Sequence, residues 1–144
     1  MLHSNYQSLV KVGRSLISER NITRLCELIL DEAQQLTRAD GGTLYLANQQ
    51  SATALNFSIV HNHSLDFRLI ANLGESIFPA INLFEENGDI NQSHVAAFTA
   101  HAKTLINIKD AYDNTQFDFT GAKRFDEENG YRTKSILAVP LLND

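Results

Sequence analysis

The sequence predicts an α+β domain in which helices flank an antiparallel sheet. Apolar residues first recur at helical spacing, then alternate as they do in strands, and later segments switch between these two periods. With 144 residues, 43% of them hydrophobic, the chain suits a single domain with one core. We expect N-terminal helices at residues 1–38 and the sheet with its associated segments at residues 39–144.

Composition and charge argue against several classes of partner. The chain carries 12 Lys and Arg against 17 Asp and Glu, for a net charge of -5. Neither sign forms a long run, so we expect no nucleic-acid partner and no membrane partner. Cys26 is the only cysteine, which rules out an intramolecular disulfide framework. The N-terminal stretch lacks the features of a signal peptide, and we expect a cytoplasmic protein.

Two helices open the chain. Apolar residues recur at steps of three and four from Tyr6 to Ile17, which predicts a first helix that ends near Ser18. Asn21 is a suitable N-cap for a second helix. The apolar stripe of that helix includes Cys26, which we interpret as a small buried side chain rather than a reactive thiol.

The period then changes from helix to strand. Residues 43–47 (TLYLA) and residues 55–61 (LNFSIVH) both alternate and are separated by a polar turn, which predicts a β-hairpin. Residues 65–72 supply a short further strand, whereas residues 75–89 form an irregular excursion broken by a proline. One face of the second hairpin strand carries Leu55, Phe57, Ile59 and His61.

A second set of elements follows the excursion. The pattern predicts a helix from Asn91 to about Lys103 and a short strand from Thr104 to Ile108. A polar loop with interleaved aromatic residues then leads to a short helix from about Thr120 to Asn129. Gly130 is placed to end this helix in a left-handed conformation.

The last strand, from Ser135 to Leu142, is apolar on both faces, so it should have a neighbour at each edge. Asn143 and Asp144 resemble the first half of a tight turn. We interpret Asp144 as an artificial or deletion boundary within the domain. We therefore expect dimerisation, strand exchange or rearranged pairing to cover the open edges.

The charged side chains at both ends of the short helix at residues 120–129 are unfavourable for its macrodipole. Lys123 and Arg124 lie in its first turn, and the acidic residues 126–128 lie in its last turn. We therefore expect its apolar contacts to hold it, and we interpret it as a lid of low local stability that a ligand orders. The alternative is an ordinary surface helix fixed by its aromatic contacts.

Two stretches carry a resemblance to a known family: residues 19–46 (ERNITRLCELILDEAQQLTRADGGTLYL) and residues 105–141 (LINIKDAYDNTQFDFTGAKRFDEENGYRTKSILAVPL). The chain resembles a GAF domain, the small-molecule sensor module of cyclic-nucleotide phosphodiesterases, adenylyl cyclases, histidine kinases and HD-GYP phosphodiesterases. The resemblance implies a GAF/PAS-like antiparallel sheet flanked by helices, here lacking the family's last strand and C-terminal helix.

The same resemblance implies a non-catalytic pocket, bounded by one face of the sheet and roofed by the two short helices, that holds a small ligand. Aromatic side chains would supply stacking area, and hydroxyl and carboxylate groups would orient the ligand. The alternative for each aromatic residue is an ordinary core position. The lining residues implied by position are Phe57, His61, Ala97, Asp110, Tyr112, Phe117, Phe125, Thr133 and Ser135.

The identity of the ligand stays open. The family's cyclic-nucleotide signature lies beyond the last strand of this chain, so a cyclic nucleotide is neither supported nor excluded, and amino acids, keto acids and tetrapyrroles remain as alternatives. No cofactor is required. The resemblance implies a small-molecule ligand, a homodimer and an output domain in the full-length protein as partners.

Nothing in the sequence indicates an enzyme or a metal site. His61 with His63, and His94 with His101, form pairs, but neither pair has a third ligand at zinc-type spacing. No Gly-x-Ser-x-Gly motif places a nucleophile. Two hypotheses therefore remain: a regulatory module whose ligand biases an output domain or a dimer partner, and a ligand-free dimerisation module that uses the first helix.

Overall fold

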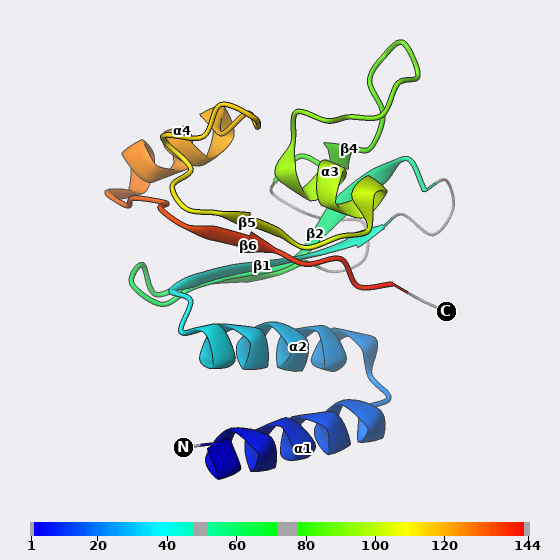
Figure 1. Ribbon diagram of the computed structural model, residues 1–144, viewed down its shortest axis with the longest axis vertical. Helices are drawn as coiled ribbons and strands as arrows, with labels where there is room; N and C mark the ends of the chain where they lie inside the picture. Colours follow the sequence, from blue (N-terminus) through cyan, green and yellow to red (C-terminus); the bar gives the residue numbers. More distant parts are fainter. Residues whose placement is uncertain (1, 48–51, 72–77, 143–144) are drawn as a thin grey trace. The chain divides into compact units, whose positions relative to one another are not determined.

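The computed structural model describes residues 2–47, 52–71 and 78–142. In this part of the chain the α+β class is confirmed, with helices and antiparallel strands following one another (Figure 1). By its internal contacts the chain divides into two compact units. Unit 1 comprises Met1–Tyr45 and Phe57–Ser76, and unit 2 comprises Leu46–Asn56 and Ile77–Asp144.

Unit 1 begins with two helices, α1 (Leu2–Ser18) and α2 (Ile22–Thr37), which lie side by side and run in opposite directions (Figure 1). Asn21 caps α2 as predicted, because its Oδ1 accepts a hydrogen bond from the Arg24 N–H at 3.1 Å. Cys26 is 3% exposed, which confirms its prediction as a buried side chain. No helix in the described ranges is both long and apolar enough to cross a membrane.

The larger sheet has the strand order β1-β2-β3, and β4 also pairs with β2. Its strands are β1 (Gly41–Ala47), β2 (Ala54–Asn62), β3 (Phe67–Ile70) and β4 (Ile81–Asn82). The predicted hairpin and the short strand after it are confirmed. Strand β4 lies where we expected an irregular excursion, and its two residues are too few to show a period.

The register of β2 is antiparallel with both of its later partners. Asn62 pairs with Phe67 on β3, and Leu55 pairs with Ile81 on β4. Because side chains alternate along a strand, His61 lies on the same face as Leu55. The register therefore fixes the face of the sheet on which the His61 side chain lies.

Helix α2 approaches β1 closely at Gly42. A Cβ atom at this position would lie 2.8 Å from Leu30 Cδ1 and 3.0 Å from Gln34 Cδ. Both neighbours are buried, at 6% and 4% exposure. The missing side chain therefore allows the helix to lie against the strand.

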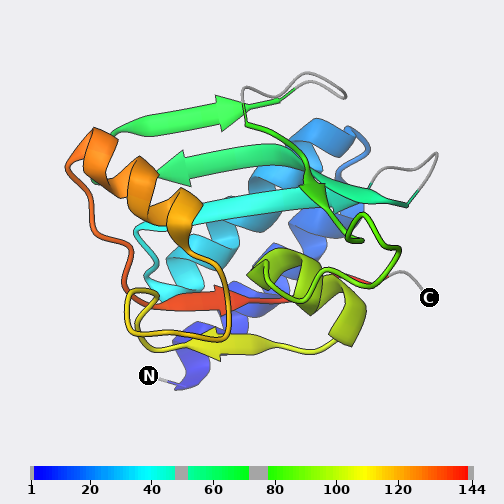
Figure 2. The same ribbon diagram turned by 90° about the horizontal axis from the view of Figure 1, so that it is seen from above.

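Unit 2 contains α3 (Val95–Ala102), β5 (Ile106–Ile108), α4 (Thr120–Asn129) and β6 (Ile136–Ala138). The two strands form a separate antiparallel sheet, drawn in yellow and red in Figure 2, in which Ile108 pairs with Ile136. The predicted bounds of α4 are confirmed, and Gly130 ends it with φ 63°. The buried core of this unit consists of Ile108, Ala111, Phe117 and Phe119.

Helix α3 begins at Val95 and not at Asn91, as the pattern predicted. The Asn91 side chain accepts hydrogen bonds from the backbone N–H groups of Ser93 and His94, at 3.1 and 3.2 Å, and so forms a turn ahead of the helix. His94 is the N-cap, since its Nδ1 accepts from the Ala96 N–H at 3.2 Å. Local side-chain capping therefore shortens the helix at its start.

The last strand is also shorter than the predicted range from Ser135 to Leu142. Strand β6 spans Ile136–Ala138, which matches the three residues of its partner β5. In the described ranges β6 pairs with β5 alone, so the expected neighbour is found at one edge, and Leu137 and Leu141 are 48% and 65% exposed. Its length is set by the partner strand and not by its own composition. The predicted turn at residues 143–144 lies outside the described ranges.

Candidate functional site

A buried carboxylate in unit 2 joins three segments of the chain. Asp126 on α4 is 1% exposed. Its Oδ2 accepts hydrogen bonds from the Tyr112 hydroxyl at 2.8 Å and from the Thr133 N–H at 2.6 Å, and its Oδ1 accepts from the Thr133 hydroxyl at 2.9 Å. The carboxylate thus ties the loop before α4, the helix itself and the approach to β6. We call Tyr112, Asp126 and Thr133 the Asp126 cluster.

An ion pair lies beside the Asp126 cluster. Arg132 Nη2 donates to both carboxylate oxygens of Asp110, at 2.9 and 3.1 Å, and the Tyr112 N–H donates to Asp110 Oδ1 at 3.0 Å. The Tyr112 N–H, followed by the Arg132 guanidinium, holds the pKa of Asp110 below its ordinary value. Asp110 is therefore an anion that the Tyr112 N–H helps to hold in place and whose charge the Arg132 guanidinium balances.

Two cations lie over the ring of Tyr112. Arg132 Cζ lies 3.6 Å from the ring centroid, and Lys123 Nζ lies 5.1 Å from it. Desolvation, and then the hydrogen bond to Asp126, raise the pKa of the Tyr112 hydroxyl. The hydroxyl therefore stays protonated and continues to donate to the carboxylate.

The apolar side of this region is ordinary core. Phe117 is 6% exposed and belongs to the buried core of unit 2, against which Tyr112 packs. Its ring centroid lies 5.4 Å from that of Phe98 on α3, in an edge-to-face arrangement. Phe117 therefore occupies the core position that we gave as the alternative to a ligand contact.

The structure brings together four of the predicted lining residues around this core and cluster: Asp110, Tyr112, Phe117 and Thr133. Three further predicted lining residues belong to unit 2. Ala97 is fully buried in α3, Phe125 is half-buried on α4, and Ser135 is exposed before β6. Ligand contact by any of these residues remains a prediction.

Sequence reasoning missed Asp126 and Arg132 as members of this region. One signal was present, because an acidic residue in the last turn of a helix is locally unfavourable. Such a residue requires compensation from elsewhere, and here the Tyr112 and Thr133 donors provide it. Glu127 and Glu128 carry the same local disadvantage but are exposed, so the pattern alone could not single out Asp126.

The remaining two predicted lining residues, Phe57 and His61, belong to unit 1. The Phe57 ring packs on Tyr45, with ring centroids 4.7 Å apart and planes inclined by 53°. Burial raises the pKa of Tyr45 to about 12, so this phenol is neutral at any physiological pH. The pair forms an aromatic contact between β1 and β2.

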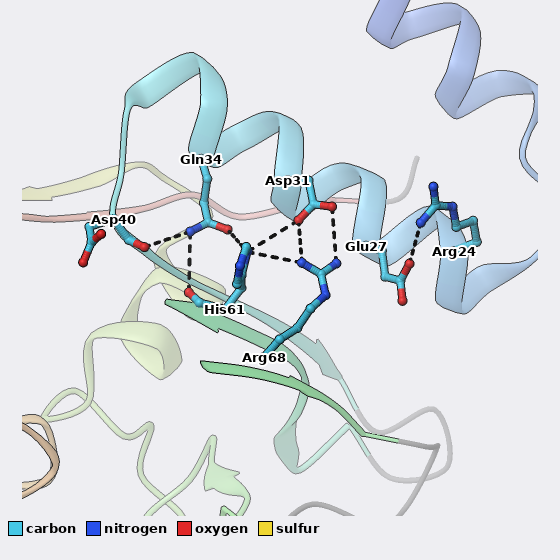
Figure 3. A network of polar contacts seen from close by, with 7 residues as sticks. All are labelled: Arg24, Glu27, Asp31, Gln34, Asp40, His61 and Arg68. Carbon is cyan, nitrogen blue, oxygen red and sulfur yellow. Dashed lines mark hydrogen bonds and ion pairs between the residues drawn. The ribbon is translucent and has the colours of Figure 1, made fainter. Parts of the chain in front are cut away.

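His61 points toward α2 and joins a polar network with Gln34 (Figure 3). The Gln34 Nε2 donates to the backbone carbonyls of Asp40, at 3.2 Å, and of His61, at 3.5 Å. These two acceptors orient the amide, so its Oε1 faces His61 Nδ1 at 3.0 Å. Because Oε1 can only accept, this contact is a hydrogen bond when Nδ1 carries the ring proton.

Arg68 on β3 completes this network. It forms two hydrogen bonds with Asp31 on α2, from Nη1 to Oδ1 at 3.0 Å and from Nη2 to Oδ2 at 3.3 Å. Its Nη1, which can only donate, also lies 3.2 Å from His61 Nδ1, and this contact is a hydrogen bond when Nδ1 is unprotonated. Desolvation, and then the charge of Arg68, hold the pKa of His61 below its ordinary value.

An open cleft of about 580 Å³ lies over this network. It contains only one of the residues predicted to bind a ligand, His61. Its lining comes from the C-terminal half of α2, the residues after it, the end of β2 and the start of β3: Asp31, Gln34, Gln35, Arg38, Ala39, Asp40, His61, His63 and Arg68. We call this hollow the α2 cleft.

The histidine pairs have structural neighbours. The rings of His61 and His63 lie edge to face, with centroids 4.3 Å apart. His94 caps α3, and His101 Nε2 lies 2.6 Å from the Leu83 carbonyl oxygen. In the described ranges no three His, Cys, Asp or Glu side chains come together in a way that would hold a metal ion.

Comparison with solved structures identifies the fold. The GAF domain of a phosphoenolpyruvate-protein phosphotransferase from Coxiella burnetii matches 96% of this chain and 70% of its own length, with a TM-score of 0.63 and 12% identity. The GAF domain of the Acinetobacter phosphotransferase matches 99% of this chain and 72% of its own, with a TM-score of 0.62 and 11% identity. The chain has a GAF fold. The predicted resemblance is thereby confirmed at the level of the fold.

Comparison with curated proteins finds relatives that are much longer. The cGMP-specific 3',5'-cyclic phosphodiesterase of Drosophila virilis is 29% identical over 134 residues, which cover 90% of this chain and 13% of that protein. The corresponding protein of Drosophila melanogaster is 28% identical over 134 residues, with 90% and 11% covered. The GAF-fold chain thus spans only a small part of the length of these relatives. No family model matches it.

Proposed function

We propose that this chain is a non-catalytic regulatory domain that binds a small molecule and signals to an attached output domain or to a dimer partner. The Asp126 cluster is the observation that carries the proposal. It gathers two of the predicted lining residues, Tyr112 and Thr133, and fastens both to α4 through one buried carboxylate. A ligand that contacts either residue therefore acts on a joint between three segments.

The physical link between binding and signalling is the stability of α4. The helix has no acidic residue in its first turn, no basic residue in its last turn and no side-chain N-cap. Its attachment therefore depends on packing and on Asp126. A ligand that strengthens or replaces the hydrogen bonds of Tyr112 or Thr133 changes how firmly α4 is held, and that change passes to the approach to β6.

The similarity to cGMP-specific phosphodiesterases makes a cyclic nucleotide the first molecule to test. The proposal does not depend on that choice, because amino acids, keto acids and tetrapyrroles also combine an aromatic or apolar body with polar groups. The Tyr112 ring offers each of these classes a stacking surface, and the hydroxyl oxygens of Tyr112 and Thr133, whose protons are donated to Asp126, can still accept hydrogen bonds.

A thermal-shift panel containing cGMP, cAMP, amino acids and keto acids tests this proposal. A ligand that binds only the folded state stabilises it by RT ln(1 + [L]/Kd), so a true ligand raises the melting temperature in proportion to the logarithm of its concentration. Amide exchange in α4 should then slow with the same ligand. No concentration-dependent shift across the panel, together with unchanged exchange in α4, would reject the proposal.

A second candidate function, a ligand-free dimerisation module, is favoured by exposed apolar residues on α1. Val10 is 40% exposed and Ile17 is 88% exposed, and their spacing of two helical turns puts them on one face. Sedimentation of the chain and of Val10→Gln with Ile17→Gln decides this case. This function would replace the first if the chain is a dimer, the double substitution dissociates it, and no ligand of the panel binds.

A further inference from the structure

The α2 cleft contains uncommitted hydrogen-bond donors. In the part of the chain that the structure describes, no hydrogen bond or ion pair engages the side chains of Gln35, Arg38 or His63. Arg38 follows the last residue of α2 in a left-handed conformation, with φ 56°, and its side chain is exposed. A guanidinium, an imidazole and an amide thus face the same hollow without partners from these ranges.

The two carboxylates that line the α2 cleft already accept hydrogen bonds. Both carboxylate oxygens of Asp31 accept from Arg68, and Asp40 Oδ1 accepts from the Ser64 N–H and hydroxyl, at 3.1 and 2.8 Å. The buried amide of Gln34 is bonded at both ends. The cleft still offers the guanidinium of Arg38, which can only donate, together with the amide N–H groups of Gln35, and a ligand that matches the guanidinium must bring acceptors.

We propose that the α2 cleft is a second binding site, and that it takes a small molecule bearing a phosphate or carboxylate group. Arg38 supplies the charged contact, with a fork of donors that suits either oxyanion. Gln35 and His63 provide further donors, and His61 adds a positive charge to the lining when it is protonated. The site lies entirely in unit 1, so a test of it does not depend on whether a ligand binds at the Asp126 cluster.

Binding of an oxyanion should be linked to protonation of His61. In the free protein desolvation, Arg68 and His63 disfavour the imidazolium, while Asp31 and Asp66 favour it less strongly. An anion held by Arg38 and His63 adds negative charge beside the ring and makes protonation easier. Proton and anion then bind together, so affinity for the anion rises as the pH falls through the histidine range.

Nuclear magnetic resonance titration of the 144-residue chain with inorganic phosphate, and separately with malonate, tests this site. We expect saturable shifts at Arg38, at His63 and in the ring nitrogens of His61, and tighter binding at about pH 5.5 than at about pH 7.5. Saturation by phosphate alone or by malonate alone assigns the class of oxyanion. Absence of saturable shifts with both anions at both pH values overturns the proposal.

Arg38→Asn and Lys103→Asn form a matched pair of variants. Each residue caps a helix in a left-handed conformation, with φ 56° and 51°, and asparagine tolerates that conformation. Each change removes one positive charge, but only Arg38 lines the cleft. We expect Arg38→Asn to weaken anion binding roughly tenfold and Lys103→Asn to leave it unchanged. Equal weakening by both would mean a general charge effect and no site.

Discussion

The two units of this chain each bury a polar side chain, and these side chains are satisfied in different ways. Asp126 in unit 2 is surrounded by donors only, from Tyr112 and Thr133. Gln34 in unit 1 donates to two carbonyls and accepts from His61, a ring whose proton can move. The first arrangement has one hydrogen-bond pattern, whereas the second depends on the protonation state of a neighbour.

This difference assigns different roles to the two regions. A carboxylate that accepts from several fixed donors holds its segments in one geometry, and breaking it is costly because a buried charge loses its partners. In the network of the α2 cleft, His61 Nδ1 faces an acceptor on Gln34 and a donor on Arg68, and its protonation decides which of the two contacts is a hydrogen bond. We therefore expect the Asp126 cluster to set how firmly α4 is held, and the α2 cleft to respond to pH.

The largest expected effect comes from Asp126→Asn. The amide would turn an N–H donor toward the donors of Tyr112 or Thr133 and would lose the charge-assisted bonds, so we expect a loss of about 2–4 kcal/mol in the free energy of unfolding. Urea denaturation measures it. Glu127→Gln is the control, because it makes the same change of charge at an exposed neighbour and should cost less than about 0.5 kcal/mol. Equal losses would mean that Asp126 is no anchor.

A smaller effect is expected at the contact between α2 and β1. In Gly42→Ala the new methyl group would lie 2.8 Å from Leu30 Cδ1, so the buried neighbours must move, at a cost of about 1–2 kcal/mol. The control is Gly13→Ala on α1, where no atom lies within 4 Å and the higher helix propensity of alanine should stabilise by about 0.5–1 kcal/mol. Opposite signs in thermal or urea unfolding support the close approach. A stabilising Gly42→Ala would refute it.

Local signals in the sequence were sufficient for most helix ends and for the strand periods. Asn21 begins α2 because its side chain is the right acceptor for the Arg24 N–H, and Gly130 ends α4 because glycine tolerates a positive φ. These determinants act within four residues of the element that they end, so composition and spacing reveal them. The GAF resemblance rested on the same order of elements.

Features that depend on distant partners were not predictable in this way. The length of β6 is set by the three residues of β5, and the burial of Asp126 is set by Tyr112 and Thr133. The sequence marks residues 126–128 only as a group, because adjacent acidic residues are chemically alike until a tertiary contact selects one. The α2 cleft was missed for the same reason, since Gln34 and His61 are 27 residues apart.

The pH dependence of stability is the smallest expected effect and tests the proposed role of His61. The folded pKa of His61 is below its ordinary value, chiefly through desolvation, and that of His94 is lowered by the same cause. Near and below the ordinary histidine pKa of about 6.5, the unfolded chain therefore binds more protons than the folded chain, and stability falls as the pH drops through this range. The carboxylates of Asp110 and Asp118, whose pKa values are also held low, lose their contribution only at more acidic pH.

Substitution of the two histidines separates their contributions. His61→Gln keeps an N–H donor for the Gln34 Oε1, and His94→Asn keeps an acceptor for the Ala96 N–H, so each variant removes a titrating group while preserving its hydrogen bond. Urea denaturation between about pH 7 and pH 5 should give a flatter dependence for each variant, and the flattest for the double variant. If the free energy of unfolding of His61→Gln depended on pH as steeply as that of the wild type, His61 would not resist protonation in the folded chain. Its contact with Arg68 would then make no contribution to the pH dependence of stability.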